Sequence, residues 1–231
     1  MPEWTAKREH PRYPVQVPVR HKPTASLPAQ AGGGWTRNLS EGGACVQLDE
    51  RLPAPSPLHL RLQTDWGAID VEAQVVWEVR EGKGGTAEGG PGEGDVLHGV
   101  AFTHLAPEKL WILRNLLHSQ NHERRASVRL PVDLPVTCQP KGSEAPPLQG
   151  RTGDMSRGGL LLCFSQALPP GTPLEVTLHP STGPITAEGE VVWVEPEEDR
   201  VQGKPIRHGL RFTALGWARA LSIALLLGEV A

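Results

Sequence analysis

The chain has 231 residues, of which 38% are hydrophobic, and a formal net charge of −3 at pH 7. This length suits one large domain or two domains of roughly 100 residues each. A general nucleic-acid binder needs a basic face or an excess of Lys and Arg, so the negative net charge argues against DNA or RNA as a partner. The 26 glycines and 23 prolines separate short apolar segments, which predicts an all-β fold.

Several features of the sequence predict a soluble, cytoplasmic protein that does not insert into a membrane. The first four residues lack the apolar core of a signal peptide. The longest apolar segment, near the C-terminus, is interrupted by Arg219 and Ser222 and is too short to span a bilayer. The three cysteines form no C-x-x-C pair and the nine histidines show no metal-binding spacing, so we expect no metal and no cofactor.

The first half of the chain begins with an arginine pair. Arg8 and Arg12 stand four residues apart and precede an alternating apolar segment at 15–19, which predicts a strand. The hexapeptide Asn38-Leu39-Ser40-Glu41-Gly42-Gly43 follows. Further alternating segments at 44–48, 58–62 and 69–79 predict strands, and the last contains a Val-Val-Trp tripeptide. The glycine-rich residues 81–95 are expected to form a flexible loop. An apolar stripe after Ala106 predicts a helix that packs on the strands of its own domain.

The same landmarks recur in the same order in the second half. Residues 8–19 align with 125–136, and the hexapeptide at 38–43 aligns with Asp154-Met155-Ser156-Arg157-Gly158-Gly159. The Val-Val-Trp tripeptide recurs at 191–193, and the pentapeptide at 98–102 aligns with 208–212 at an offset of 110. A second helix is predicted from about Leu215 and, like the first, is expected to pack on its own domain. Four landmarks in one order predict a duplication. We therefore expect two domains, at 5–119 and 122–231.

The two recurring motifs carry side chains suited to a guanine nucleotide with exposed phosphates. Guanidinium forks match phosphate oxygens and the O6/N7 edge of guanine. The carboxylate of Asp154 can accept from purine N–H groups, and the hydroxyl of Ser156 can donate or accept. Glycine lets the backbone turn sharply and lets a flat ligand approach. No nucleophile stands beside a base, so we expect no enzyme activity and no catalytic residue.

The pairing of R-x-x-x-R with D/N-x-S-x-x-G, present twice, resembles the PilZ family, the small β-barrel receptors for the bacterial second messenger cyclic di-GMP. The resemblance implies two tandem six-stranded antiparallel barrels, each with one C-terminal helix. It also implies that each arginine arm folds over the ligand. The ligand-binding residues that it implies are Arg124, Arg125, Arg129, Asp154, Ser156 and Gly159 in the second domain, and Arg8, Arg12, Asn38, Ser40 and Gly43 in the first.

The first copy departs from the second at three positions. Lys7 replaces an arginine, Pro11 stiffens the arm, and Asn38 stands where the second copy has Asp154. A neutral hydrogen bond is about half as strong as a charge-assisted one, and lysine cannot form the planar guanidinium fork. We therefore expect the second site to bind more tightly.

Two interpretations remain from the sequence. The first is a cyclic di-GMP receptor that relays ligand level through a rearrangement of its domains, because Arg124 follows the first helix almost directly and the arm is then also the linker. The alternative is a PilZ-type interaction module in which one or both nucleotide sites no longer function. The downstream protein partner, the number of ligands per site and the oligomeric state are open.

A histidine and a tryptophan recur at equivalent positions of the two halves, and we expect both to have structural roles. His98 and His208 each begin a strand beside glycine, which favours a structural or surface role over ligand binding. Trp77 and Trp193 are expected in the barrel cores and not as base-stacking surfaces.

Overall fold

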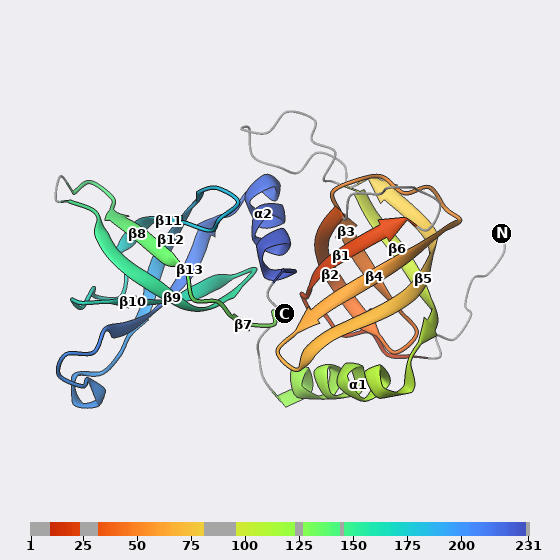
Figure 1. Ribbon diagram of the computed structural model, residues 1–231, viewed down its shortest axis with the longest axis horizontal. Coiled ribbons are helices and arrows are strands. Elements are labelled where there is room, and N and C mark those ends of the chain that lie inside the picture. The colour runs from red at the N-terminus through yellow and green to blue at the C-terminus, as the bar shows by residue number, and fades with distance from the viewer. Residues whose placement is uncertain (1–9, 24–31, 81–95, 123–126, 144–145, 230–231) are drawn as a thin grey trace.

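The computed structural model describes residues 10–23, 32–80, 96–122, 127–143 and 146–229. It contains two closed six-stranded antiparallel barrels side by side, with two helices (Figure 1). The predicted fold class, tandem barrels with one helix after each, is confirmed. The predicted loop at 81–95 lies outside the described residues.

The first barrel closes in the order β1-β2-β3-β6-β5-β4. Its strands are β1 (Pro18–Pro23), β2 (Gly32–Ser40), β3 (Gly43–Leu48), β4 (Ser56–Thr64), β5 (Gly67–Arg80) and β6 (Val96–Leu105). Alternation decides which side chains enter the core. In β4, Leu58, Leu60 and Leu62 are buried, whereas His59 and Arg61 between them are exposed.

The second barrel repeats this arrangement strand for strand. Its strands are β8 (Pro135–Pro140), β9 (Leu148–Ser156), β10 (Gly159–Phe164), β11 (Pro173–Leu178), β12 (Ile185–Val194) and β13 (Ile206–Ala214). Pairing of β10 with β9 closes the barrel, and the short β7 (Leu130–Pro131) adds to the other side of β9. A 3-10 helix at Glu197–Asp199 lies between β12 and β13.

A β-bulge places both Val-Val-Trp tryptophans outside their barrels. The register shifts between Val75 and Trp77 in β5, and at the equivalent point before Trp193 in β12, so the tryptophan leaves the inward face. The expectation that they lie in the cores is wrong: Trp77 is half-buried and Trp193 is 38% exposed. Each indole lies over a glycine of the next strand, since a Cβ on Gly99 or Gly209 would come within 2.0 Å or 1.9 Å of the indole nitrogen.

His98 and His208 are structural, as expected. Both are fully buried. The Nε2 of His98 accepts from the Leu52 N–H at 3.0 Å, and the Nε2 of His208 accepts from the Leu168 N–H at 3.0 Å. Each ring therefore fastens a loop to its barrel. Burial lowers the pKa of both imidazoles.

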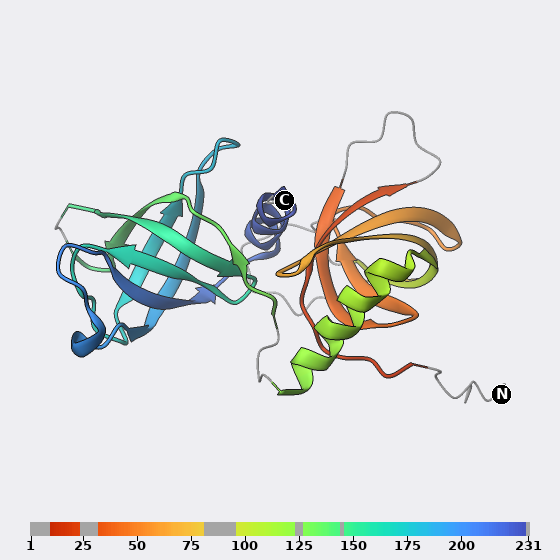
Figure 2. The same ribbon diagram turned by 60° about the horizontal axis from the view of Figure 1, so that its bottom comes forward.

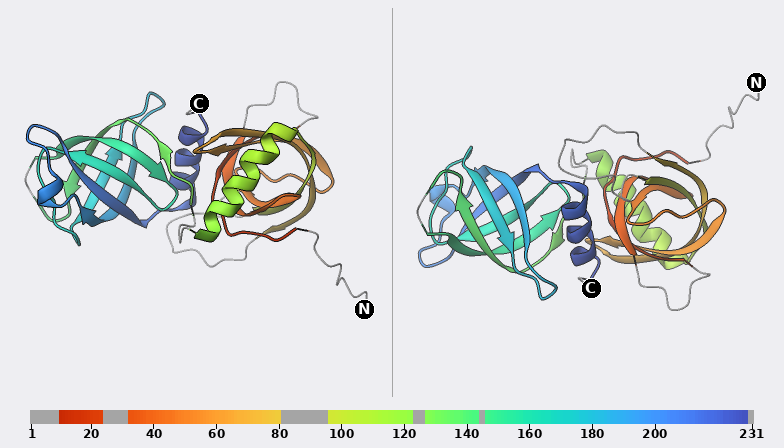
Figure 3. Two further views of the ribbon diagram at one scale, coloured as in Figure 1. Left: turned by 90° about the horizontal axis from the view of Figure 1, so that it is seen from below. Right: turned by 90° about the horizontal axis from the view of Figure 1, so that it is seen from above.

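The two helices differ in what they cover. Helix α1 (Pro107–His122) packs its buried Leu113, Leu116 and Leu117 on its own barrel, as predicted. Helix α2 (Trp217–Leu227) contacts β12 of its own barrel, but its other side contacts β1 and β2 of the first barrel. It thus lies between the barrels (Figures 2 and 3), so the expectation that it packs on its own barrel is only partly right. Within the described part of the chain, no helix is long and apolar enough to cross a membrane.

Candidate nucleotide-binding site

The D-M-S-R-G-G hexapeptide forms the turn between β9 and β10. The hydroxyl of Ser156 accepts from the Gly158 N–H and donates to the carbonyl of Gly159, both at 3.3 Å. A Cβ on Gly159 would lie 2.0 Å from the carbonyl oxygen of Leu210, so only glycine fits beside β13. Ser156 is buried. These two residues therefore shape the turn that presents the rest of the site.

The turn between β2 and β3 in the first barrel has the same construction. Ser40 donates to the carbonyl of Gly43 at 2.9 Å, and a Cβ on Gly43 would lie 2.3 Å from the carbonyl oxygen of Val100. The serine and last glycine of the motif have one role in both copies.

The first residue of each hexapeptide holds an acceptor without a donor. Asp154 Oδ1 is buried, has no hydrogen-bond donor among the described residues, and lies 3.8 Å from Arg129 Nη1. Asn38 Oδ1, its equivalent in the first barrel, likewise is buried and finds no donor in the described segments. A buried acceptor left unsatisfied costs about 1–3 kcal/mol. Its recurrence at one motif position in both copies is typical of a site that a ligand completes.

The arginine arm of the second domain lies beside this acceptor. Pairing of Leu130 with Met155 and of Pro131 with Asp154 runs the arm along β9, so Arg129 lies at the turn with its side chain 44% exposed. In the first domain, Tyr13 pairs with Leu39 through two 2.9 Å backbone hydrogen bonds.

The structure therefore brings part of each predicted residue set to one place. In the second domain these residues are Arg129, Asp154, Ser156 and Gly159, and in the first they are Arg12, Asn38, Ser40 and Gly43. The remaining arginines of the prediction, Arg8, Arg124 and Arg125, lie outside the described residues.

A row of residues on the outer face connects the second turn to Trp193. Trp193 pairs with Gly209 on β13, and Gly209 pairs with Leu161 on β10. The Leu161 side chain in turn lies over Gly153 of β9, next to Asp154. Strands lie about 4.8 Å apart, so Trp193 is roughly 14 Å from β9. Sequence reasoning missed this surface because the bulge that turns Trp193 outward has no clear signature in the sequence.

Arg157, in the middle of the second turn, contacts the first barrel. Its Cζ lies 5.8 Å from the ring centroid of Trp35, and its Nη2 donates to Gln47 Oε1 at 3.4 Å. The Arg157 N–H also donates to Ser127 Oγ at 3.3 Å. The turn that carries the candidate site is thus part of the domain interface.

The residue at the same position of the first turn makes a different contact. Glu41 pairs with Arg114 of α1, whose guanidinium Nη2 lies 2.9 Å from Glu41 Oε2 and whose hydrogen bond holds the pKa of Glu41 below its ordinary value. The first turn is therefore fastened to its own helix, and the second to the neighbouring barrel.

The arm that leads into the second domain also contacts the first. The carbonyl of Gln16 accepts from the Val128 N–H at 3.1 Å and from Ser127 Oγ at 3.3 Å. A movement of this arm therefore changes contacts between the domains.

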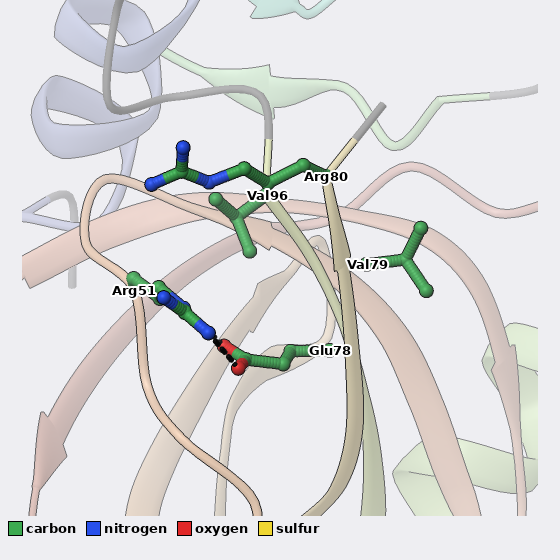
Figure 4. A pocket seen from close by; sticks show the side chains of 5 residues that line it. All are labelled: Arg51, Glu78, Val79, Arg80 and Val96. Atoms are coloured by element: carbon green, nitrogen blue, oxygen red, sulfur yellow. Dashed lines mark hydrogen bonds and ion pairs between the residues drawn. The ribbon is translucent and has the colours of Figure 1, made fainter. Parts of the chain in front are cut away.

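A cavity of about 350 Å³ lies on the first barrel at the end of β5 and the start of β6 (Figure 4). Arg51 and Glu78 line it and satisfy each other through two hydrogen bonds of 2.5 and 2.9 Å. The first turn adjoins the later part of β6, because Gly43 pairs with Ala101. This cavity is therefore separate from the candidate site. The described residues contain no group of three His, Cys, Asp or Glu side chains placed to hold a metal ion.

The sequence profile of the PilZ domain matches residues 6–119 and 123–217. The chain belongs to the PilZ domain family. Among curated proteins, this PilZ protein is 38% identical over 101 residues to the serine/threonine-protein kinase Pkn1 of Myxococcus xanthus. The match covers 42% of this chain but only 14% of the length of that kinase.

Solved PilZ structures are similar to this chain at low identity. The PilZ domain of Escherichia coli YcgR with c-di-GMP is 17% identical, with a TM-score of 0.39, and covers 47% of this chain and 92% of its own. The YcgR complex with c-di-GMP is 14% identical, with a TM-score of 0.36, over 91% of this chain and 82% of that one. The Bacillus subtilis inhibitor of motility, MotI/DgrA, is 9% identical, with a TM-score of 0.38, over 92% of this chain and 94% of that one.

Proposed function

We propose that this PilZ protein is a non-enzymatic receptor for cyclic di-GMP, with its stronger site at the turn between β9 and β10. Membership of the PilZ family supports the ligand class. The observation that carries the proposal is the buried Asp154 Oδ1, which lacks a hydrogen-bond donor in the described residues and lies 3.8 Å from Arg129. A guanine supplies N–H donors to such a carboxylate, and its phosphates supply partners for the guanidinium.

The residues have distinct roles in the proposed complex. Arg129, helped by Arg124 and Arg125 of the same arm, binds phosphate oxygens and the O6/N7 edge of a guanine. Asp154 accepts from the opposite edge of the base. Ser156 and Gly159 hold the turn in the shape that makes both contacts possible.

The outer face between Asp154 and Trp193 supports the same ligand. The indole of Trp193 lies over Gly209, which pairs with Leu161 on the neighbouring strand. A base can lie on such a surface, and stacking on an aromatic side chain contributes about 1–3 kcal/mol per base. We propose that a guanine contacts Trp193.

The first barrel provides the second, weaker site. Arg12 and Asn38 occupy the positions of Arg129 and Asp154, with Arg8, Ser40 and Gly43 completing the motif. Because the Asn38 amide is neutral, its hydrogen bond to a guanine lacks the charge assistance that Asp154 provides.

We propose that ligand binding at the second site is relayed through the domain interface. A ligand shifts a conformational equilibrium by its differential affinity for the two states. Arg129 follows Ser127 and Val128, which contact Gln16, and Arg157 of the same turn contacts Trp35 and Gln47. An arm that closes over a ligand therefore perturbs these contacts.

Titration calorimetry with cyclic di-GMP on the intact chain tests the proposal. We expect two sites of unequal affinity. Asp154→Ala should remove the tighter one and Asn38→Ala the weaker one. If the intact chain gives no binding heat and no ligand-induced change in melting temperature, the protein is an interaction module without a functional nucleotide site.

A further inference from the structure

The second barrel carries an open cavity of about 620 Å³ on the outer face of β9 and β10. Asp133, Gln149, Arg151 and Cys163 line it from the arm and the two strands, and Lys204 lines it from the loop before β13. Cyclic di-GMP is assigned to the turn at the far end of these strands, so the cavity is a separate feature.

The equivalent face of the first barrel is already occupied by the second domain. Gln16 accepts from Ser127 and Val128, and Trp35 donates to the carbonyl of Ala220. Gln47 accepts from Arg157 on the same face.

Each of these docking residues aligns, in the repeat, with a residue that lines the cavity. Gln16 aligns with Asp133, and Trp35 and Gln47 align with Arg151 and Cys163. Gly33, over which Leu221 and Leu225 of α2 pack, aligns with Gln149. The two barrels thus present the same face, which is covered in the first and open in the second.

The docking helix also has a counterpart. The α2 residues at the first barrel are Ala220, Leu221 and Leu225. Their equivalents in α1 are Leu110, Trp111 and Asn115, 110 positions earlier in the sequence. Leu110 and Asn115 are half-buried, and Trp111 is 65% exposed. The face of α1 that carries Trp111 therefore corresponds to the helix side of the domain interface, and the β9/β10 face corresponds to its barrel side. Within the described structure, neither face is covered by the other.

We propose that α1 of a second copy of this chain docks on the β9/β10 face of the second barrel, in the way that α2 docks on the first. Trp111 enters the cavity where Leu221 lies over Gly33 in the internal interface. This assignment rests on the repeat and on both interface surfaces, and is independent of nucleotide binding.

The side chains that differ between the two faces suit this partner. Arg151 and Lys204 place two cations at a cavity that has room for an indole, and a guanidinium over an indole is a favourable contact. The internal interface already uses that pair, with Arg157 over Trp35. In the proposed contact the aromatic side chain comes from the helix and the cation from the barrel.

The contact joins two unlike surfaces, α1 of one copy and the β9/β10 face of the next. Two copies related by a two-fold axis make this contact twice and close a dimer, whereas successive copies arranged head to tail form a chain. In either case each copy contributes Trp111 to one neighbour and its β9/β10 face to another or to the same one.

Complementation between two variants tests the proposal by sedimentation velocity on the full chain. The intact protein should form species heavier than its 25.0 kDa monomer as concentration rises. Trp111→Glu and Arg151→Glu should each weaken self-association at least tenfold. Mixed together, they should form a one-to-one dimer, because the first variant keeps an intact cavity and the second keeps an intact helix face.

Controls separate this contact from other causes. Trp66, on the β4–β5 turn of the first barrel, is 44% exposed, and Trp66→Glu should leave association unchanged. Gln149→Glu repeats the barrel-side test if Arg151→Glu lowers the melting temperature by leaving Asp133 without its partner. A monomer at every concentration, an equal effect of Trp66→Glu, or a mixture that stays monomeric would overturn the proposal.

Discussion

The indole N–H of Trp35 in the first barrel donates a hydrogen bond of 2.8 Å to the backbone carbonyl of Ala220 in α2. Both residues are buried, so the bond is shielded from water. The guanidinium of Arg157, in the turn between β9 and β10, lies over the same indole, with its Cζ 5.8 Å from the ring centroid. One side chain of the first barrel thus contacts both the helix and the candidate ligand turn of the second domain.

This geometry predicts that Trp35→Phe weakens the domain interface. The substitution keeps an aromatic ring but removes the donor, which should lower the free energy of unfolding by about 1–3 kcal/mol. Urea denaturation of the intact chain measures this loss. An unchanged midpoint and slope would show that the Trp35–Ala220 bond does not stabilise the fold.

Arg157→Ala is expected to uncouple binding from domain arrangement. The substitution removes the contacts of Arg157 with Trp35 and Gln47. It leaves every residue assigned to the ligand in place. Affinity for cyclic di-GMP should change less than about threefold, a difference well below 1.4 kcal/mol. The ligand-induced change in interdomain distance, measured by small-angle scattering on the intact chain, should be reduced. A full distance change in the variant would contradict the relay.

Arg129→Ala should weaken the second site ten- to a hundredfold, because one charge-assisted contact contributes about 1.5–3 kcal/mol. Arg61→Ala, at an exposed arginine on β4 of the first barrel, is the matched control and should leave binding at the second site normal. Asp154→Ala should also lose binding, yet without lowering stability, because it removes a buried acceptor that has no donor in the described residues. Equal losses for Arg129→Ala and Arg61→Ala would argue against the assigned site.

Asn38→Asp, combined with Lys7→Arg, should tighten the first site. The carboxylate converts a neutral hydrogen bond into a charge-assisted one, and arginine provides the planar fork. Calorimetry of this double variant in an Asp154→Ala background isolates the first site. If affinity stays the same or falls, another feature of the first domain, such as Pro11 in its arm, limits binding.

The protein should lose stability as the pH falls below about 6.5. Burial lowers the pKa of His98 and His208 in the folded state from the ordinary value of 6.5. The unfolded chain therefore binds protons first, so the stability from the neutral rings is complete above 6.5 and declines as the pH falls towards the lowered values. Urea midpoints at pH 7.5 and 5.5 measure the effect. His208→Gln, which keeps an acceptor for the Leu168 N–H, should make the midpoint less dependent on pH.

The sequence by itself determined most of the architecture and the chemical character of the site. Alternation such as that of Leu58, Leu60 and Leu62 predicts a strand because the side-chain period of a strand is local. The hexapeptide turns at Ser40 and Ser156 could be predicted for the same reason, since their hydrogen bonds join residues only two or three positions apart.

Only the tertiary structure decided where Trp193 and α2 lie. A single extra residue in the β12 bulge reverses the side of the sheet that Trp193 occupies, and periodicity alone does not register such an insertion. Helix α2 also packs on the first barrel because Leu221 and Leu225 lie over Gly33 and because Trp35 bonds to Ala220, nearly 190 residues apart in the chain. Contacts over that separation come from the packing of two complete domains, so no local pattern in either segment contains them.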